Sequence, residues 1–526
     1  MTMKHIIFVL VTVSSLAFAQ KPDWVRNYGK TPIYPDQLYL LGFGISKVSR
    51  ENDRAQSLQK AVESAKGNLI QSIRVKLQSS VGSVTEERNQ KVSSYFSSAT
   101  QSTSSLEVQG LDVKSYYDDN EETTYALAYV SRERLATIYL EKEKQLRNGI
   151  AQKMQSGKAA EDRGMKTLAL DEYLSCYLLF RQLEEARAIL FSSKSAAAKA
   201  FEELEGVVTT DEIDMGIVRR AGDKLLQRPL ENVEDAAWQL AYCIKEQADI
   251  KDATVLVTPM TYGDTRMGSP FSRFFKIVLE NKLNEVAKWT PVQQVAISQS
   301  SARDMTRQAA EASGAKYVVR GTYWEQGSMV KFIISLLRAS DSRLIGGAEI
   351  VVRDSIVQKA SLDLKPQNFQ AALGDQRQFN ADEILGGGLN LEVWTNKGTD
   401  DLVFTKGERL QAYVRVNLPS YIRFIYHLAD GKRALLLDNY YVDQSKVNMV
   451  YQIPEEFECD EPYGAEFLQA FARTEPFEPI ATVAVDGYNI LKDDLKGFLT
   501  MQRGMKKVKQ GTLQTETRLV VTTMEK

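Results

Sequence analysis

The loop from Gly263 to Pro270 comes closest to a binding motif. It runs Gly-Asp-Thr-Arg-Met-Gly-Ser-Pro between an expected strand and an expected helix. Ser269 suits the N-cap and Pro270 the first helical position, and backbone amides at such a helix start can hold an anion. Arg266 and Arg273 would add positive charge. The loop lacks the Lys-Ser/Thr pair of a phosphate-binding loop, so an ordinary capped loop is the simpler interpretation, with Arg266, Ser269 and Arg273 as a candidate anion site.

Catalytic side chains are scarce. Beyond residues 1–19, His427 is the single histidine, so a Ser-His-Asp triad could form only there and a multi-histidine zinc site nowhere. A hydrogen-bonded histidine at a strand end is the simpler interpretation. The acidic stretch 118–122 lacks the glycine and the spaced ligands of a calcium loop, and no acidic pair is singled out for glycoside cleavage. The sequence therefore predicts no catalytic residue, metal or cofactor, and hence no enzyme.

A set of aromatic residues forms the third candidate: Tyr421, Phe424, Tyr440 and Tyr441. Strand periodicity places Phe424 and Tyr426 on one face and Tyr421 nearer the other. Some rings could then be exposed to stack on sugars or to contact a protein partner. Burial in a core is the default for strand aromatics.

The elements that position these residues begin with an α+β domain over residues 20–138. A strand at 38–44 is closed by glycines, a second strand lies at 124–131, and apolar residues recur every three or four positions between Ala55 and Ile73. That recurrence is typical of an amphipathic helix. Residues 139–250 then predict a helical spacer that resembles one tetratricopeptide unit, fewer than the about three that an independent solenoid needs.

Three further segments complete the expected organisation. Residues 251–365 predict a small α/β layer domain, with strands at 253–259, 292–297, 317–324, 330–337 and 345–352, helices at 271–287 and 302–313, and hairpins joining the last three strands. Residues 366–388 are polar and end in three glycines, which predicts a linker. Residues 389–526 predict a mostly-β sandwich or barrel, and the last thirty residues are expected to form either a final strand or a tail. The whole chain is thus expected to be a multidomain α+β protein.

Composition narrows the class of protein. A chain of 526 residues should form about three or four domains. Its formal net charge of −2 argues against nucleic acid as a partner. The cysteines at 176, 243 and 459 are too far apart in sequence for a dense disulfide framework, so we expect three buried, unpaired thiols.

The N-terminus predicts export. Lys4 precedes the apolar run 6–11, and Ala17-Phe18-Ala19 before Gln20 forms a small-x-small cleavage pattern, so residues 1–19 are expected to be a cleaved signal peptide. A lipoprotein would carry a cysteine in place of Gln20, so we expect no lipid anchor. No later apolar run reaches the about 18 residues of a membrane span, which predicts a peripheral protein.

Residues 22–138 resemble the Lpp-twenty-type lipoprotein domain of bacterial envelopes. The resemblance rests on segments 22–25, 41–46 and 125–132 around the alanine-rich helix, although the lipidated cysteine of that family is missing.

Residues 251–352 resemble the α/β domain shared by CsgG-like curli-secretion proteins, the middle domain of FlgT and the N-terminal domain of TolB, on segments 255–259 and 313–321. Residues 389–490 resemble the bacterial domain-of-unknown-function family numbered four-three-eight-four, and the carriers stand in the family order: 402–408, 421–426, 430–431, 462–466 and 473–477. These resemblances imply envelope contexts and no chemistry, and the first two imply a homo-oligomer.

The sequence thus predicts a non-enzymatic, exported envelope protein, periplasmic and associated with the outer membrane. It would act as a scaffold or assembly factor through contacts with envelope proteins. The alternative is a ligand-sensing or peptidoglycan- or glycan-binding module that uses the C-terminal β domain.

Overall fold

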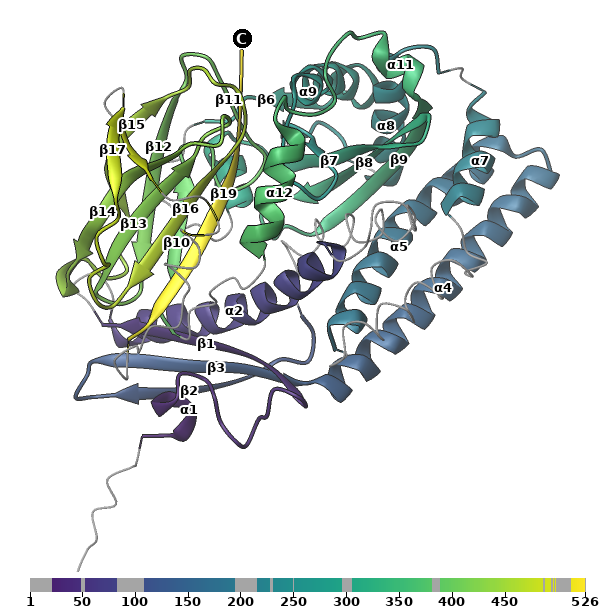
Figure 1. Cartoon of the computed structure of the whole chain (residues 1–526). Coiled ribbons are helices and arrows are strands. Elements are labelled where there is room, and N and C mark those ends of the chain that lie inside the picture. The colour runs from purple at the N-terminus through teal and green to yellow at the C-terminus, as the bar shows by residue number, and fades with distance from the viewer. Residues whose placement is uncertain are drawn as a thin grey trace, which may run out of the picture.

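The computed structural model describes residues 21–48, 53–82, 108–193, 215–227, 230–248, 250–295, 305–380, 388–485, 488–492, 495, 497 and 512–525. The predicted signal peptide lies outside these residues. Figure 1 shows a small sheet and helix at the bottom, a long helical hairpin at the right, an α/β layer at the top and a β-rich part at the left. The multidomain α+β class is confirmed, and the C-terminal part is mostly strands.

The N-terminal part is a three-stranded antiparallel sheet of order β1-β3-β2, covered on one face by a helix. Its elements are α1 (Asp23–Arg26), β1 (Tyr39–Lys47), α2 (Arg54–Gly82), β2 (Asp112–Asp118) and β3 (Thr123–Ser131). Ala61, Ala65 and Leu69 of α2 are fully buried at helical spacing and share a core with Ala126 and Ala128 of β3. The predicted amphipathic helix is therefore confirmed.

Gly42 and Gly44 lie inside β1, whereas the sequence pattern placed the end of the strand at these glycines. A Cβ atom on Gly42 would lie 2.1 Å from the carbonyl oxygen of Ala65, and one on Gly44 would lie 2.1 Å from that of Ala61. The glycines allow the backbone of α2 to lie directly on the strand. They serve helix packing and do not stop the strand, which continues to Lys47.

The described residues between 139 and 250 are mostly helical, as predicted, in α4 (Arg132–Asp162), α5 (Lys166–Ser193), α7 (Met215–Leu226) and α8 (Val233–Ala248). Helix α5 is buried along most of its length and packs against α4, α7, α8 and β9. Helix α8 packs on the α/β sheet, where the side-chain amide of Gln247 donates to the carbonyl of Gly347 (2.6 Å) and accepts from its amide (3.1 Å). The helical segment is thus part of the core, although the sequence pattern predicted a spacer.

The α/β part follows the predicted order closely. Its elements are β4 (Thr254–Val257), β5 (Thr261–Tyr262), α9 (Pro270–Lys282), η2 (Leu283–Ala287), β6 (Thr290–Val292), α10 (Met305–Ala312), β7 (Tyr317–Gln326), β8 (Met329–Arg338), β9 (Leu344–Arg353) and α11 (Asp354–Gln358). The sheet has the order β6-β4-β7-β8-β9, with β4 parallel to both neighbours and the last three strands antiparallel. Only the two-residue strand β5, which pairs with β7, was not predicted among its strands.

Part of the predicted linker at 366–388 is helix α12 (Phe369–Asn380), while most of the glycine-rich end of that linker lies outside the described residues. Phe369 and Phe379 are buried in a core with Phe467 and Phe471 of the β domain.

The C-terminal part forms two sheets, of order β10-β12-β15 and β11-β19-β16-β13-β14-β18-β17. The elements are β10 (Leu391–Thr395), β11 (Leu402–Thr405), β12 (Arg409–Val416), β13 (Ser420–His427), β14 (Arg433–Val442), η3 (Gln444–Lys446), β15 (Tyr451–Glu458), β16 (Gly464–Arg473), β17 (Thr482–Val485), β18 (Tyr488–Leu491) and β19 (Gln514–Met524). Val393 and Val414 of the small sheet share a core with Phe424, Leu468 and Val521 of the large one. The arrangement is therefore a sandwich, and the last residues provide an inner strand, β19, which is one of the two alternatives predicted for them.

The free edge of β1 is covered by asparagine side chains. Their amides donate to three alternate backbone carbonyls: Asn68 to Phe43 (2.7 Å), Asn417 to Ile45 (2.6 Å) and Asn448 to Lys47 (3.2 Å). Asn68 belongs to α2, and the other two belong to the C-terminal sandwich. Since buried carbonyl groups need hydrogen-bond donors, these bonds join the first and last parts of the chain.

Two hydrophobic cores cross the expected domain boundaries. One runs from Leu69 of α2 through Ile189 of α5 to Phe332 of β8. The other joins Phe43 of β1 to Leu391 of β10. The described parts of the chain therefore pack as one continuous body.

We predict that Gly44→Ala lowers the free energy of unfolding by about 1–3 kcal/mol or more, because the added methyl group forces α2 away from β1. Denaturant unfolding followed by circular dichroism measures the change. Gly374→Ala in α12 is the matched control: a Cβ there meets nothing within 4 Å, so the helix should gain about 0.5–1 kcal/mol. Equal effects at the two sites would contradict the packing argument.

Candidate functional site

The candidate anion loop is a capped helix start whose amides are already used. The amide of Gly268 donates to Thr522 Oγ1 (2.8 Å) and that of Ser269 to Ser272 Oγ (2.8 Å). Ser269 accepts in turn from the Ser272 amide (3.1 Å), which completes a capping box with Pro270 in the first turn. The predicted cap is confirmed, and no anion cradle is formed by these amides.

Arg266 of this loop belongs to a joint between the α/β part and the sandwich. Arg266 forms an ion pair with Asp400 (3.2 Å), while Arg273 lies half-buried in the first turn of α9. Burial alone would raise the pKa of Asp400, but Arg266 and Arg320 hold it below its ordinary value. The charge of Arg266 is therefore paired with a protein carboxylate, so this side chain is not available to bind an anion.

Asp401 extends the same joint. Its carboxylate accepts from Arg320 Nε (3.0 Å) and from the hydroxyl of Thr258 (3.0 Å). Burial raises the pKa of Asp401 despite the charge of Arg320. Because Thr258 directly follows β4, this contact places a loop of the sandwich at the carboxyl end of a parallel strand.

A small cavity lies at this place. It is lined by Leu256, Thr258, Pro259, Gln294, Ala309 and the loop 397–401, and its volume is about 30 Å³. Open α/β sheets usually bind ligands outside the carboxyl ends of their parallel strands, in pockets of roughly 300–1,000 Å³. Here loop 397–401 fills that position and leaves room for water only.

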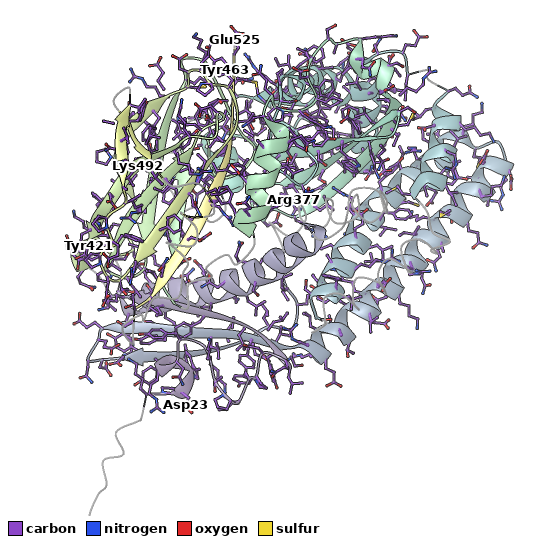
Figure 2. All side chains as sticks on the ribbon, viewed as in Figure 1. Asp23, Arg377, Tyr421, Tyr463, Lys492 and Glu525 are labelled. Atoms are coloured by element: carbon purple, nitrogen blue, oxygen red, sulfur yellow. The ribbon has the colours of Figure 1, made fainter. Side chains whose placement is uncertain are left out.

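Of the four aromatic residues predicted as a candidate surface, one has an exposed ring in the structure. Phe424 has no exposed surface and lies in the core between the two sheets, so its assignment to a surface is wrong. Tyr440 packs against the same core, and Tyr421 packs against the opposite face of the large sheet. Tyr441 is 47% exposed and rests on Tyr421 with ring centroids 4.7 Å apart. Figure 2 places Tyr421 at the outer left margin of the sandwich.

His427 is a buried strand residue, not a proton carrier. Its Nε2 lies 3.0 Å from Gln469 Oε1, and Phe379 of α12 contacts its ring edge-on. Burial, together with the charges of Arg433 and Arg518, lowers its pKa to about 3. The predicted hydrogen bond is present, and His427 is the last residue of β13, as predicted, with its ring against α12.

The three cysteines are buried and unpaired, as predicted. Burial raises the pKa of each thiol, and that of Cys459 reaches about 11. Nucleophilic cysteines need the opposite shift. Within the described residues, no group of three or more His, Cys, Asp or Glu side chains could hold a metal ion.

Glu466 is a buried carboxyl group that the sequence did not single out. It accepts from the Tyr426 hydroxyl (2.7 Å) and from the Ala429 amide (3.1 Å), and burial raises its pKa to about 7. Such acids are candidates for acid–base catalysis, but the cavity at loop 397–401 does not include it. Its contacts hold the end of the sandwich together.

An ordered apolar loop between α1 and β1 is the feature that sequence analysis missed. Ile33 is 65% exposed and Leu38 is 62% exposed, the highest fractions among large apolar side chains of the described residues. Two contacts hold the loop in place. The rings of Tyr34 and Tyr129 stack with centroids 4.3 Å apart, and the Arg132 side chain donates to the Asp36 carbonyl (3.0 Å). We define this exposed segment, residues 33–38, as the apolar loop.

Comparison with known proteins places this loop in a recognised domain. Residues 22–131 match the model of the LPP20 lipoprotein family. The predicted N-terminal resemblance is therefore confirmed, and we refer to these residues as the LPP20-type domain. The other two resemblances remain predictions. No curated protein matches the chain.

Several solved structures are similar to parts of the chain. The LpoB C-terminal domain from Salmonella enterica is 17% identical and covers 22% of this chain and 98% of its own, with a TM-score of 0.17. PelC from Paraburkholderia phytofirmans, a dodecamer, is 14% identical over 21% of this chain and 81% of its own, with a TM-score of 0.15. The secreted protein HP1454 from Helicobacter pylori is 11% identical over 65% and 98%, with a TM-score of 0.19. These scores are too low to support a shared function.

No helix of the described residues is long and apolar enough to cross a lipid bilayer.

We predict a pH-dependent contribution of Glu466 to stability. Its pKa rises from 4.5 to about 7 on folding, so the folded protein keeps a proton that the unfolded chain loses. Between these pH values the free energy of unfolding should fall as pH rises, by about 3 kcal/mol at 1.4 kcal/mol per unit. Denaturant unfolding from pH 4 to 8 should show this fall in the wild type and not in Glu466→Gln. Parallel curves would contradict the burial of an ionisable carboxyl group at this position.

Proposed function

We propose that this protein is a non-enzymatic, exported protein of the bacterial envelope, periplasmic and associated with the outer membrane. It acts as a scaffold or assembly factor through protein–protein contacts. The match of residues 22–131 to the LPP20 lipoprotein family supports the envelope setting. The exposed, ordered apolar loop of the LPP20-type domain is the observation that carries the contact role.

The apolar loop has the physical properties of a docking surface. Ile33 and Leu38 expose large apolar side chains to water. A partner that covers them removes apolar surface from water, which favours binding. The stacked Tyr34 and Tyr129 and the bond from Arg132 hold the backbone in place before a partner arrives. A preorganised loop loses little conformational entropy on binding, so a small apolar contact can suffice.

The chemistry of the interior supports a contact role over catalysis. The ligand position at the carboxyl end of β4 is filled by loop 397–401. His427 is neutral and enclosed, and the thiols are buried with raised pKa values. Substrate-dependent turnover by the purified chain, abolished by one carboxylate substitution, would contradict a non-enzymatic role.

The partner surface should itself be apolar and proteinaceous. The rim of the loop carries both signs of charge, with Lys114 over the rings of Tyr34 and Tyr129 and Asp112 paired with Arg134. A mixed rim around an apolar centre is typical of protein interfaces. An anionic lipid surface would instead favour a uniformly basic rim.

We predict that Ile33→Glu with Leu38→Glu reduces recovery of cross-linked envelope partners at least about tenfold, since each charge must be desolvated at the contact. Cross-linking in intact cells, followed by mass spectrometry, measures the recovery. Leu140→Glu on α4 is the matched control, because Leu140 is 57% exposed and lies outside the loop. All variants should keep the wild-type melting temperature.

Unchanged partner recovery in the double variant would rule out the loop as the contact surface. Retention of the mature protein on purified peptidoglycan sacculi, lost on Tyr441→Ala, would instead favour the glycan-binding alternative. That alternative has one supporting observation, the exposed ring of Tyr441 on Tyr421.

A further inference from the structure

Most strand edges of the described sheets are protected against pairing. Proteins normally protect edges with charge, proline or a covering element. Asparagine side chains cover β1, Asp112 and Lys114 place charge on β2, and Pro291 lies in β6. Helices α5 and α8 pack at β9, and β10 is fully buried. Strand β15 carries Pro454 and Glu456. β11 is likewise almost entirely buried.

Among the described residues, strand β17 shows none of these devices. It ends the seven-stranded sheet, and its residues 482–485, Thr-Val-Ala-Val, include no charge and no proline. Val483 is 47% exposed and Val485 is 40% exposed. Figure 1 shows β17 at the outer left edge of the sandwich, where no described strand follows it.

The neighbouring strand extends the apolar surface. In the hairpin, Val485 lies opposite Tyr488 and Val483 opposite Ile490. Since side chains alternate along a strand, these four lie on one face of the hairpin. Tyr488 is 50% exposed. An unpaired backbone edge and an exposed apolar face therefore coincide on one short element.

We propose that β17 pairs antiparallel with β17 of a second copy of this chain, joining the two seven-stranded sheets across a two-fold axis. A two-fold contact requires a surface complementary to itself. With Ala484 opposite Ala484 of the second copy, each Val483 lies opposite a Val485. The valines of both copies then fall on one face, and both Tyr488 rings border the joined patch.

Charge favours self-pairing with a second copy at β17 and not at β2, the exposed edge strand of the N-terminal sheet. Strand β2 paired with itself about Ser115 would place Asp112 opposite Asp118, a repulsive contact repeated twice. The corresponding register of β17 opposes no two charges within the strand. The interface is small, so the dimer should dissociate on dilution. It does not involve the apolar loop, and partner capture by that loop can succeed or fail independently.

The first test is site-specific disulfide formation. In an antiparallel pair, facing Cα atoms lie about 4.5–5.5 Å apart, within the range that a disulfide spans. The purified mature chain with Ala484→Cys should therefore form a covalent dimer under mild oxidation, while the buried native thiols do not react. Ser115→Cys, an exposed site on β2, is the matched control and should stay monomeric. Equal yields at both sites would overturn the proposal.

The second test is the concentration dependence of mass. Analytical ultracentrifugation of the wild type should show a monomer–dimer equilibrium, and Val485→Lys should raise the dissociation constant at least about tenfold by opposing lysine to Val483 in a desolvated contact. Val113→Lys on β2, at 36% exposure, should leave the equilibrium unchanged. A monomer at all concentrations, or a dimer indifferent to Val485→Lys, would overturn the proposal, even if β17 bound another protein.

Discussion

An edge strand leaves a row of carbonyl groups without partners, and the fold of this protein depends on how β1 meets that requirement. Asn417 and Asn448 reach from the sandwich to the carbonyls of Ile45 and Lys47. The Asn417 amide also donates to the Gly388 carbonyl (2.8 Å), and its oxygen accepts from the Asn390 amide (2.7 Å). All polar groups of this buried side chain are thus satisfied. Because an unpaired buried group costs about 1–3 kcal/mol, the sandwich and the LPP20-type domain stabilise each other.

The sandwich also determines what lies at the end of β4. Its loop 397–401 occupies the position where a ligand would bind, and Arg320 and Thr258 hold Asp401 there. That ligand position is thus occupied by the protein's own side chains. What the molecule offers to other molecules lies on its surface, in the apolar loop and the edge of β17.

Local patterns in the sequence correctly predicted the features that depend on residues near one another in the chain. The strands and helices between 253 and 352, the cap at Ser269 and the burial of the cysteines follow from periodicity, capping and composition. Long-range packing was not accessible in this way. The glycines of β1 were interpreted as a strand end because their role depends on α2, and Phe424 looked exposable because its partners in the core come from the other sheet.

The candidate sites show the same division. Arg266 looked available for an anion because its partner Asp400 lies far along the chain. The sequence did not indicate the apolar loop, because it does not show which side chains the rest of the fold leaves exposed, as it leaves Ile33 and Leu38. Sequence patterns indicate which side chains are suited to binding, but only the folded structure shows which of them remain exposed.

The contacts at β1 should make the LPP20-type domain and the sandwich unfold as one cooperative body. Hydrogen exchange of peptides from β1 and β16, measured by mass spectrometry at increasing denaturant, tests this coupling. We expect both peptides to exchange through the same opening, with equal free energies and equal denaturant dependence. Exchange of β1 through an opening several kcal/mol lower, while β16 stays protected, would contradict it.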